Sequence, residues 1–244
     1  GVETCALPIE QQVAFYRSPD LKEWTRVGAF GPDGATGGAW ECPDLMRIPA
    51  KDGRSSIWAL KVGLNPGSLQ GGSGEQYFLG SFDGKTFTRS TEPGSGGWTD
   101  YGKDSYCAIS YNHLPDGDAP TLLGWMSNWE YAKELPTAPW RGQMTLARRV
   151  TFVEDRDGMA LSQEPVIAPL REGAGVAIAK VLPGRLDSVV LLKTASPAEM
   201  VLHFDPADAQ SFGVRLYSDA EHWTEIGFDR AKMGFYVDRM HSGL

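Results

Sequence analysis

The chain has 244 residues, of which 41% are hydrophobic, and it contains 29 Gly and 16 Pro. This composition predicts a turn-rich globular protein with enough residues for one large or two modest domains. Its formal net charge of -8, from 31 acidic and 23 basic side chains, argues against nucleic acid or an anionic membrane as a partner, because like charges repel. A neutral partner such as a carbohydrate is more compatible with this net charge than a polyanion is. No apolar run approaches the length of a membrane span.

Metal and cofactor sites are not predicted. Cys5, Cys42 and Cys107 are an odd number at no metal-like spacing, so the sequence indicates neither a zinc site nor a disulfide framework. The four histidines form no paired motif. The chain opens on Gly1 rather than Met and stops just after a strand-like run, and both features are what a truncated sequence would show.

A strand-and-turn pattern near the start of the chain occurs a second time. Residues 13–16 read as a short buried strand, and residues 18–26 carry Ser, Asp, Lys, an aromatic residue, Thr and Arg in an order that returns at residues 81–89. The offset is 81 minus 18, or 63 residues, and further strand candidates lie between the copies. A repeat holding several strands is typical of a propeller blade. Two similar hairpins in an unrelated β fold are the alternative.

Residues 37–45, Gly-Gly-Ala-Trp-Glu-Cys-Pro-Asp-Leu, place a carboxylate between two apolar neighbours. Glu41 there would be partly desolvated, and burial favours the protonated form that a general acid needs. The alternative is a glutamate at a strand end that is hydrogen-bonded to a backbone amide. Asp44, three residues later, is expected to alternate away from Glu41 on the strand or to neighbour it.

Two later stretches also carry candidate binding groups. Residues 99–108 place Asp100 and Asp104 around a glycine, in a loop entering a strand, where a carboxylate can accept hydrogen bonds from vicinal sugar hydroxyls. An Asx-turn at Asp100 and a solvated Asp104 are the alternative. Residues 122–132 form a buried strand that ends in aromatics, which serve either as core or as a sugar-stacking platform.

Beyond residue 166 the strands follow one another at shorter intervals. Strand-like runs begin near residues 176, 189, 201, 212, 223 and 235, at spacings of 11 to 13 residues, which is typical of an antiparallel sandwich. We expect two domains, residues 1–168 and residues 169–244. The Gly-rich stretch of residues 63–80 in the first domain predicts a loop that leads into a strand and passes close to another group, such as a substrate. A flexible linker is the alternative.

Four stretches, residues 30–45, 63–84, 99–108 and 122–148, resemble in the same order the fructan-cleaving enzymes of glycoside hydrolase family 32. The resemblance implies an all-β fold, namely a five-bladed β-propeller of which only the later blades are present, followed by a partial C-terminal β-sandwich. It implies that Glu41 is the catalytic acid/base, that Asp100 binds fructose hydroxyls and that Trp125 is a wall of the pocket. Ser105 and Cys107 depart from the family pattern, in which an aromatic or Asn and an Ala are usual.

The family's own nucleophile is not found in this sequence. Glycosidases of this type use two carboxyl groups, and the family places its nucleophilic aspartate in a Trp-Met-Asn-Asp-Pro-Asn-Gly motif and a second aspartate in Arg-Asp-Pro. Neither motif occurs in residues 1–244. We therefore expect an inactive fragment of a retaining exo-fructosidase, similar to a levanase or inulinase, whose full-length form is secreted or periplasmic. A fructosyltransferase and a non-catalytic carbohydrate-binding propeller are the alternatives.

Overall fold

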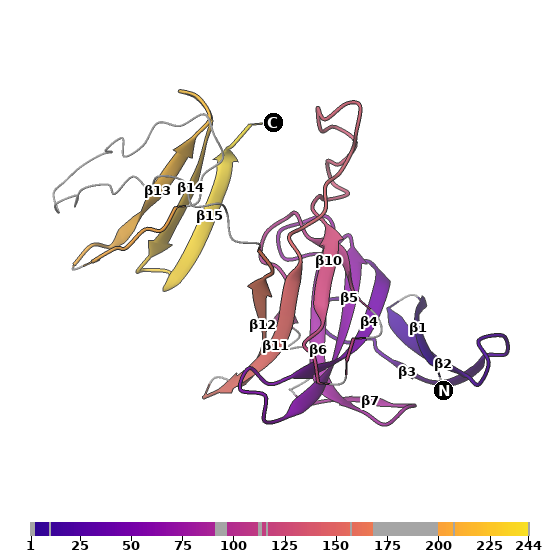
Figure 1. Cartoon of the computed structure of the whole chain (residues 1–244). Helices are drawn as coiled ribbons and strands as arrows, with labels where there is room; N and C mark the ends of the chain where they lie inside the picture. Colours follow the sequence, from indigo (N-terminus) through magenta and orange to yellow (C-terminus); the bar gives the residue numbers. More distant parts are fainter. Residues whose placement is uncertain are drawn as a thin grey trace. The chain divides into compact units, whose positions relative to one another are not determined.

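The protein is described by a computed structural model (Figure 1), which places residues 3–9, 11–90, 97–111, 114–115, 117–156, 158–167, 200–206 and 208–243. The chain divides into two compact units, Gly1–Ile167 and Ala168–Leu244. Every regular element in the described ranges is a β-strand, which confirms the predicted all-β fold. Within the same ranges, the structure contains no helix with the length and apolar character that crossing a membrane requires.

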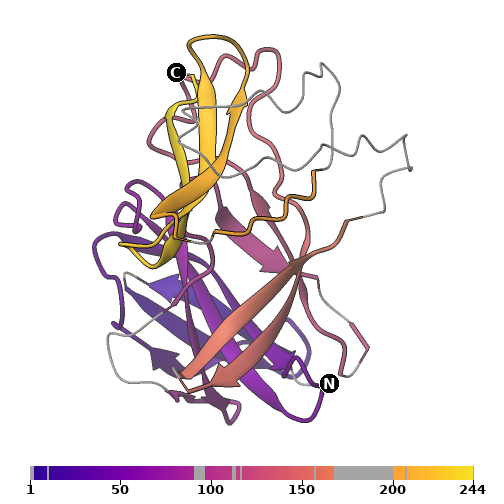
Figure 2. The same cartoon turned by 90° about the vertical axis from the view of Figure 1, so that its left-hand side faces the viewer.

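The first unit consists of three antiparallel sheets in which strands that follow one another in the chain are neighbours (Figures 1 and 2). Sheet 1 contains β1 (Glu3–Ile9), β2 (Gln12–Ser18) and β3 (Thr25–Phe30). Sheet 2 contains β4 (Ala39–Pro49), β5 (Ser56–Asn65), β6 (Gly74–Phe82) and β7 (Phe87–Arg89), with β8 (Gly97–Trp98) paired to β6. Sheet 3 contains β9 (Tyr106–Ser110), β10 (Thr121–Trp125), β11 (Arg148–Asp155) and β12 (Gly158–Pro165). Successive meanders of this kind are the blades of a β-propeller.

The sequence repeat corresponds to one hairpin that occurs in two consecutive sheets. Its copies form the turns between β2 and β3 and between β6 and β7. In the first turn Asp20 Oδ1 accepts hydrogen bonds from the N–H groups two and three residues later, at 2.9 and 3.0 Å. Asp83 Oδ1 does the same in the second turn, at 2.9 and 2.7 Å. These backbone donors lower the pKa of both carboxyls, because they stabilise the ionised form.

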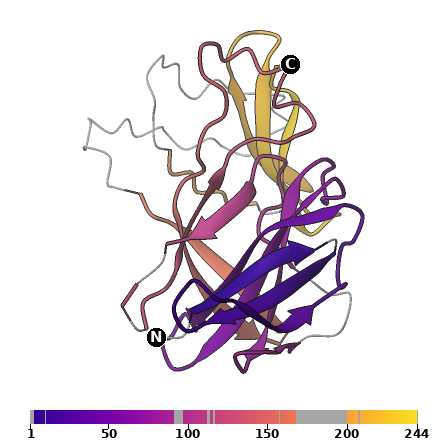
Figure 3. The ribbon, with the colours of Figure 1, turned by 90° about the vertical axis from the view of Figure 1, so that its right-hand side faces the viewer.

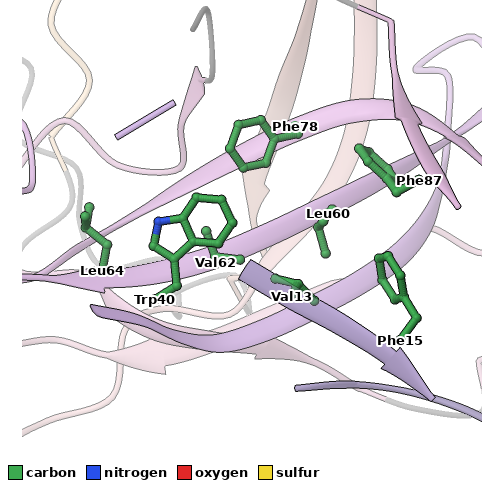
Figure 4. Packing of buried hydrophobic residues seen from close by; sticks show 8 residues of the cluster. All are labelled: Val13, Phe15, Trp40, Leu60, Val62, Leu64, Phe78 and Phe87. Atoms are coloured by element: carbon green, nitrogen blue, oxygen red, sulfur yellow. The ribbon is translucent and has the colours of Figure 1, made fainter. Parts of the chain in front are cut away.

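The core lies on the two faces of sheet 2. Alternate residues of β5 point in opposite directions, so one face joins the cluster against sheet 1 and the other joins the cluster against sheet 3. Figure 4 shows the first cluster, in which residues of β2 pack on those of sheet 2: Val13, Phe15, Trp40, Leu60, Val62, Leu64, Phe78 and Phe87. The second cluster comprises Met46, Ile48, Ala59, Leu79, Ala108, Leu122, Val150 and Phe152. Figure 3 shows sheet 1 from the side that faces away from sheet 3.

A buried ion pair lies on the face of sheet 2 that is turned toward sheet 3. Lys61 Nζ and Glu75 Oε1 are 2.6 Å apart, and both side chains have no exposed surface. Glu75 Oε1 also accepts a hydrogen bond of 2.7 Å from the N–H of Ala108 on β9, and Thr99 Oγ1 lies 3.3 Å from Glu75 Oε2. On the other side, Lys61 Nζ donates to the carbonyl of Cys42 on β4, at 3.5 Å. The pair therefore links the first strands of sheets 2 and 3.

The second unit contributes one antiparallel sheet of β13 (Ser211–Tyr217), β14 (Trp223–Asp229) and β15 (Gly234–His241). These strands begin where the last three strand-like runs were expected. The run near residue 201 is described and is not a strand, so this expectation was wrong. Its Met200, Val201 and Phe204 side chains are exposed, and the Phe204 ring centroid lies 5.0 Å from that of Phe212 on β13. The runs near residues 176 and 189 lie outside the described residues, and the two-sheet sandwich stays a prediction.

Substituting Leu60→Ala should lower the free energy of unfolding by about 2–5 kcal/mol, because it empties space in the cluster between sheets 1 and 2. Leu69→Ala is the matched control, since Leu69 is 52% exposed and its truncation should change stability by less than about 0.5 kcal/mol. Urea unfolding with an unchanged slope measures both. Equal losses for the two variants would contradict the assigned core.

Lys61→Met should destabilise the chain by about 3–5 kcal/mol, because it leaves the Glu75 carboxylate buried without its counter-charge. Adding Glu75→Gln to Lys61→Met should recover part of that loss, since no lone charge remains. Urea unfolding of wild type, single and double variants gives the comparison. A double variant less stable than Lys61→Met alone would show that the charge is not what makes the single change costly.

A candidate active site where two sheets meet

Glu41 lies near the start of β4, on the face turned toward sheet 3. The preceding Trp40 is 2% exposed and packs in the opposite cluster, and its Nε1 donates to the carbonyl of Ala35 at 2.9 Å. Gln76 binds the same Ala35 on both its N–H and its carbonyl, each at 2.8 Å. These bonds hold Ala35, in the loop before β4, against sheet 2.

A bulge in β4 changes which residues face sheet 3. The pairing of β4 with β5 shifts between Glu41 and Asp44, and Cys42 in the bulge has a φ of 46°. The extra residue reverses the alternation. As a result Asp44 faces sheet 3 as Glu41 does, where it accepts hydrogen bonds from the N–H of Ser110 at 2.7 Å and from its hydroxyl at 3.2 Å. Of the two expectations for Asp44, alternation away from Glu41 was wrong for this reason, and a position near Glu41 on the same strand is the one observed.

The closest partner of Glu41 is a tyrosine of sheet 3 that sequence reasoning did not select. The hydroxyl of Tyr106, the first residue of β9, donates to Glu41 Oε2. Tyr106 is 2% exposed, and burial followed by the contact with Glu41 raises the pKa of its hydroxyl. Tyr106 therefore stays protonated at neutral pH and acts as a hydrogen-bond donor. A single buried tyrosine within a strand gives no signal of this role.

A disulfide bond joins Cys42 to Cys107, which the sequence analysis did not identify. The two Cα atoms are 5.4 Å apart, within the range that a disulfide spans. Each cysteine directly follows one member of the Glu41–Tyr106 contact. Three side-chain links thus cross from β4 to β9, and we call them the β4–β9 seam: Glu41 to Tyr106, Cys42 to Cys107, and Asp44 to Ser110.

Trp125, at the end of β10, lies beside the tyrosine of this seam. Its ring centroid is 6.4 Å from that of Tyr106 and 4.9 Å from that of Trp129. Gly142 approaches closely, since a Cβ built there would lie 2.5 Å from Trp125 Nε1. Tyr106 therefore connects two of the predicted residues, Glu41 and Trp125, in one cluster of side chains.

Asn128 binds three loops at this end of the sheets, and it was also missed. It is fully buried, and its Nδ2 lies within 3.2 Å of the carbonyls of Gly71, Ser73 and Lys103. Its Oδ1 accepts from the N–H groups of Ser73 at 3.2 Å and Glu130 at 2.9 Å. The loops before β6 and β9 and the loop after β10, which extends beyond the sheet in Figure 1, are thereby fixed to one another.

Asp100 makes the contacts of the alternative interpretation. Its Oδ1 accepts a hydrogen bond of 2.8 Å from the N–H of Gly102, which forms the Asx-turn, and its Oδ2 lies 2.8 Å from Arg148 Nη1. Among the described contacts, none joins Asp100 to the cluster of Glu41 and Trp125. The binding role of Asp100 stays a prediction. Asp104 is not simply solvated, because it accepts a hydrogen bond from the hydroxyl of Tyr131.

A cavity of about 360 Å³ lies beside the Asp100–Arg148 pair. Its lining includes Asp104, Met126, Arg148 and Gln163, and it does not include Glu41. The case for chemistry at Glu41 therefore depends on its contacts in the seam. Within the described residues, no group of three or more His, Cys, Asp or Glu side chains is arranged to hold a metal ion.

The chain is similar to a known protein family and to individual members of it. Residues 5–165 match the family model described as the N-terminal domain of glycosyl hydrolases family 32. The levanase of Bacillus subtilis (strain 168) is 35% identical over 240 residues, which are 95% of this chain and 35% of the levanase. The extracellular exo-inulinase of Aspergillus awamori is 36% identical over 247 residues, which are 95% of this chain and 45% of that protein.

Solved structures agree with these relatives. The exo-inulinase from Aspergillus awamori superposes with a TM-score of 0.78 at 30% identity, covering 99% of this chain and 49% of the inulinase. A fructofuranosidase variant from Schwanniomyces occidentalis gives a TM-score of 0.79 at 25% identity and covers 100% of this chain and 50% of its own. The chain spans half the length of these relatives or less. Its all-β fold resembles part of these structures, and the chain belongs to glycoside hydrolase family 32.

Proposed function

We propose that this chain carries the acid/base of a retaining exo-fructosidase and that Glu41 is this residue. The observation that carries the proposal is the contact of Glu41 with the buried Tyr106 hydroxyl, at the meeting of two propeller sheets and beside Trp125. A carboxyl whose orientation is fixed by a neutral donor is suited to proton transfer with a bound sugar. The contact lies in a chain whose relatives include a levanase and exo-inulinases.

In this mechanism Glu41 acts twice. It first gives its proton to the glycosidic oxygen as the bond to the fructosyl carbon breaks and a second carboxylate forms the covalent fructosyl intermediate. It then takes a proton from the water that attacks the intermediate, which releases fructose and restores both groups. Tyr106 stays a hydrogen-bond donor through both steps because the pKa of its hydroxyl is raised.

We expect neither Asp44 nor Asp100 to supply the second carboxylate. Asp44 is bonded to Ser110, and Asp100 is paired with Arg148. The family's nucleophile motif does not occur in residues 1–244. We therefore expect a polypeptide of these residues alone to release no fructose, since the transition state lacks its support from the opposite face of the ring.

The proposed substrate is a terminal fructosyl unit of a fructan or of sucrose. Structures of the Schwanniomyces occidentalis enzyme contain fructosylnystose and fructosyl-erythritol, which supports a carbohydrate ligand. Trp125 would stack against the apolar face of the sugar and Asp100 would bind its hydroxyls. Residues 122–148 resemble levanases and exo-inulinases, which favours polymeric fructan.

Secretion of the whole protein is part of the proposal. The related inulinases are described as extracellular. The Cys42–Cys107 disulfide supports this location, because disulfides persist in oxidising compartments and are rare in the cytosol.

The domain limits, residues 1–168 and 169–244, remain a prediction.

The experiment measures fructose release from levan, inulin and sucrose. The polypeptide is assayed alone and as an extended polypeptide, in which the nucleophile-bearing propeller region of the Bacillus subtilis levanase precedes it. The extended polypeptide should release fructose, and Glu41→Gln in it should lower kcat by about 10² to 10⁴-fold. Glu164→Gln is the matched control, since Glu164 forms an exposed ion pair with Lys51 and should leave kcat unchanged.

Three outcomes would contradict the proposal. Glu41→Gln with the wild-type rate would remove Glu41 from the chemistry. Release by the 244-residue polypeptide alone, abolished by Glu41→Gln, would show a nucleophile within these residues. Transfer of fructose to a sugar hydroxyl in place of water would identify a fructosyltransferase.

A further inference from the structure

The Cys42–Cys107 disulfide lies where two backbone irregularities face each other. In β4 the pairing shifts between Glu41 and Asp44, so the regular ladder with β5 does not hold Cys42. In β9 the pairing with β10 shifts in the same way across Cys107. Both cysteines have left-handed backbone, with φ of 46° and 48°. Residues other than glycine keep this conformation only where their surroundings hold it.

The acid and its tyrosine partner are attached directly to these irregular segments. Glu41 precedes Cys42, and Tyr106 precedes Cys107, so the disulfide joins the backbone one residue beyond each member of the contact. The other bonds to this part of the seam are from Lys61 to the Cys42 carbonyl and from the N–H of Ala108 to Glu75. These two hydrogen bonds hold the backbone after Glu41 and after Tyr106. The disulfide sets the separation between the β4 segment that carries Glu41 and the β9 segment that carries Tyr106.

We propose that the Cys42–Cys107 disulfide is a positioning element for the catalytic acid, and that reducing it lowers the rate of fructose release while the sheets remain packed. This role rests on the proposed function of Glu41. The sheets stay packed because the Lys61–Glu75 ion pair and the bonds of Asp44 to Ser110 do not involve sulfur. The loss should therefore be in kcat rather than in KM.

The redox step requires an external dithiol. The dithiol supplies two electrons and two protons, the Sγ–Sγ bond of Cys42 and Cys107 breaks, and two thiols form while the reductant closes into its own disulfide. Reoxidation by a disulfide reagent reverses the exchange. Activity should follow this state, falling on reduction and returning on reoxidation.

The first measurement counts thiols in the 244-residue chain that carries Cys5→Ala, under non-denaturing conditions and after unfolding. Thiol titration should find none before reduction and two after it. Two thiols in the untreated, unfolded protein would overturn the proposal, because no disulfide would be present. This result does not depend on any enzymatic activity.

The second measurement follows Tyr106 in the same chain, by ultraviolet difference absorbance during alkaline titration. With the disulfide intact, the Tyr106 hydroxyl should ionise only above the usual range, since burial and Glu41 raise its pKa. In Cys107→Ala, the Tyr106 hydroxyl should ionise at a lower pH than with the disulfide intact, because the contribution of Glu41 to its raised pKa is lost while burial remains. An unchanged titration, with unchanged far-ultraviolet circular dichroism, would show that the disulfide does not hold the contact.

The third measurement uses the extended polypeptide with Cys107→Ala, and Cys5→Ala as the matched control. Cys107→Ala should lower kcat by about 10 to 10²-fold with KM within about twofold, as expected for a misplaced acid. Cys5→Ala should leave both constants unchanged. A wild-type kcat in Cys107→Ala would overturn the proposal. If the wild-type extended polypeptide releases no fructose, the proposed function fails, and the thiol and tyrosine measurements still decide the positioning role.

Discussion

The buried ion pair of Lys61 and Glu75 is the interaction on which the geometry of the site depends. Two charges without exposed surface are tolerated only when they are paired and their remaining bonding capacity is used. Here that capacity is directed at the backbone of two different sheets, at the Cys42 carbonyl and the Ala108 N–H. Satisfying the pair therefore holds β4 and β9 beside each other, and the Cys42–Cys107 disulfide then sets the separation of the two segments that carry Glu41 and Tyr106.

The alternation of apolar residues along β5 determines which face of sheet 2 carries Lys61. Leu60 and Val62 point into the cluster with sheet 1, so the residue between them, Lys61, must point toward sheet 3. Two residues before Lys61 on β5, Ala59 lies on the same face and belongs to the second cluster. The strand β5 is therefore apolar on both faces around Lys61, which is paired across the sheet with Asp44 of β4. The bulge in β4 turns Asp44 toward the same face as Lys61.

Local features of the fold could be predicted from the sequence, and long-range partners could not. The repeated Asp turns gave the hairpins correctly, because each turn is made by residues close together in the chain. Glu41 was selected from its apolar neighbours. Tyr106 and Cys107 lie 65 residues from their partners, so only the folded sheets reveal those contacts. The two alternatives for Asp44 could not be resolved from the sequence, because a bulge reverses strand alternation and leaves no signature in the residue pattern.

A double-mutant cycle between Glu41 and Tyr106 tests the account most directly. Glu41→Gln, Tyr106→Phe and the double variant are compared with wild type by kcat/KM for fructose release in the extended polypeptide. Because the two side chains are in contact, their effects should be strongly non-additive, with a coupling free energy of about 0.5–3 kcal/mol. Effects that add within about 0.3 kcal/mol would show that Tyr106 does not act on Glu41, and would contradict the account.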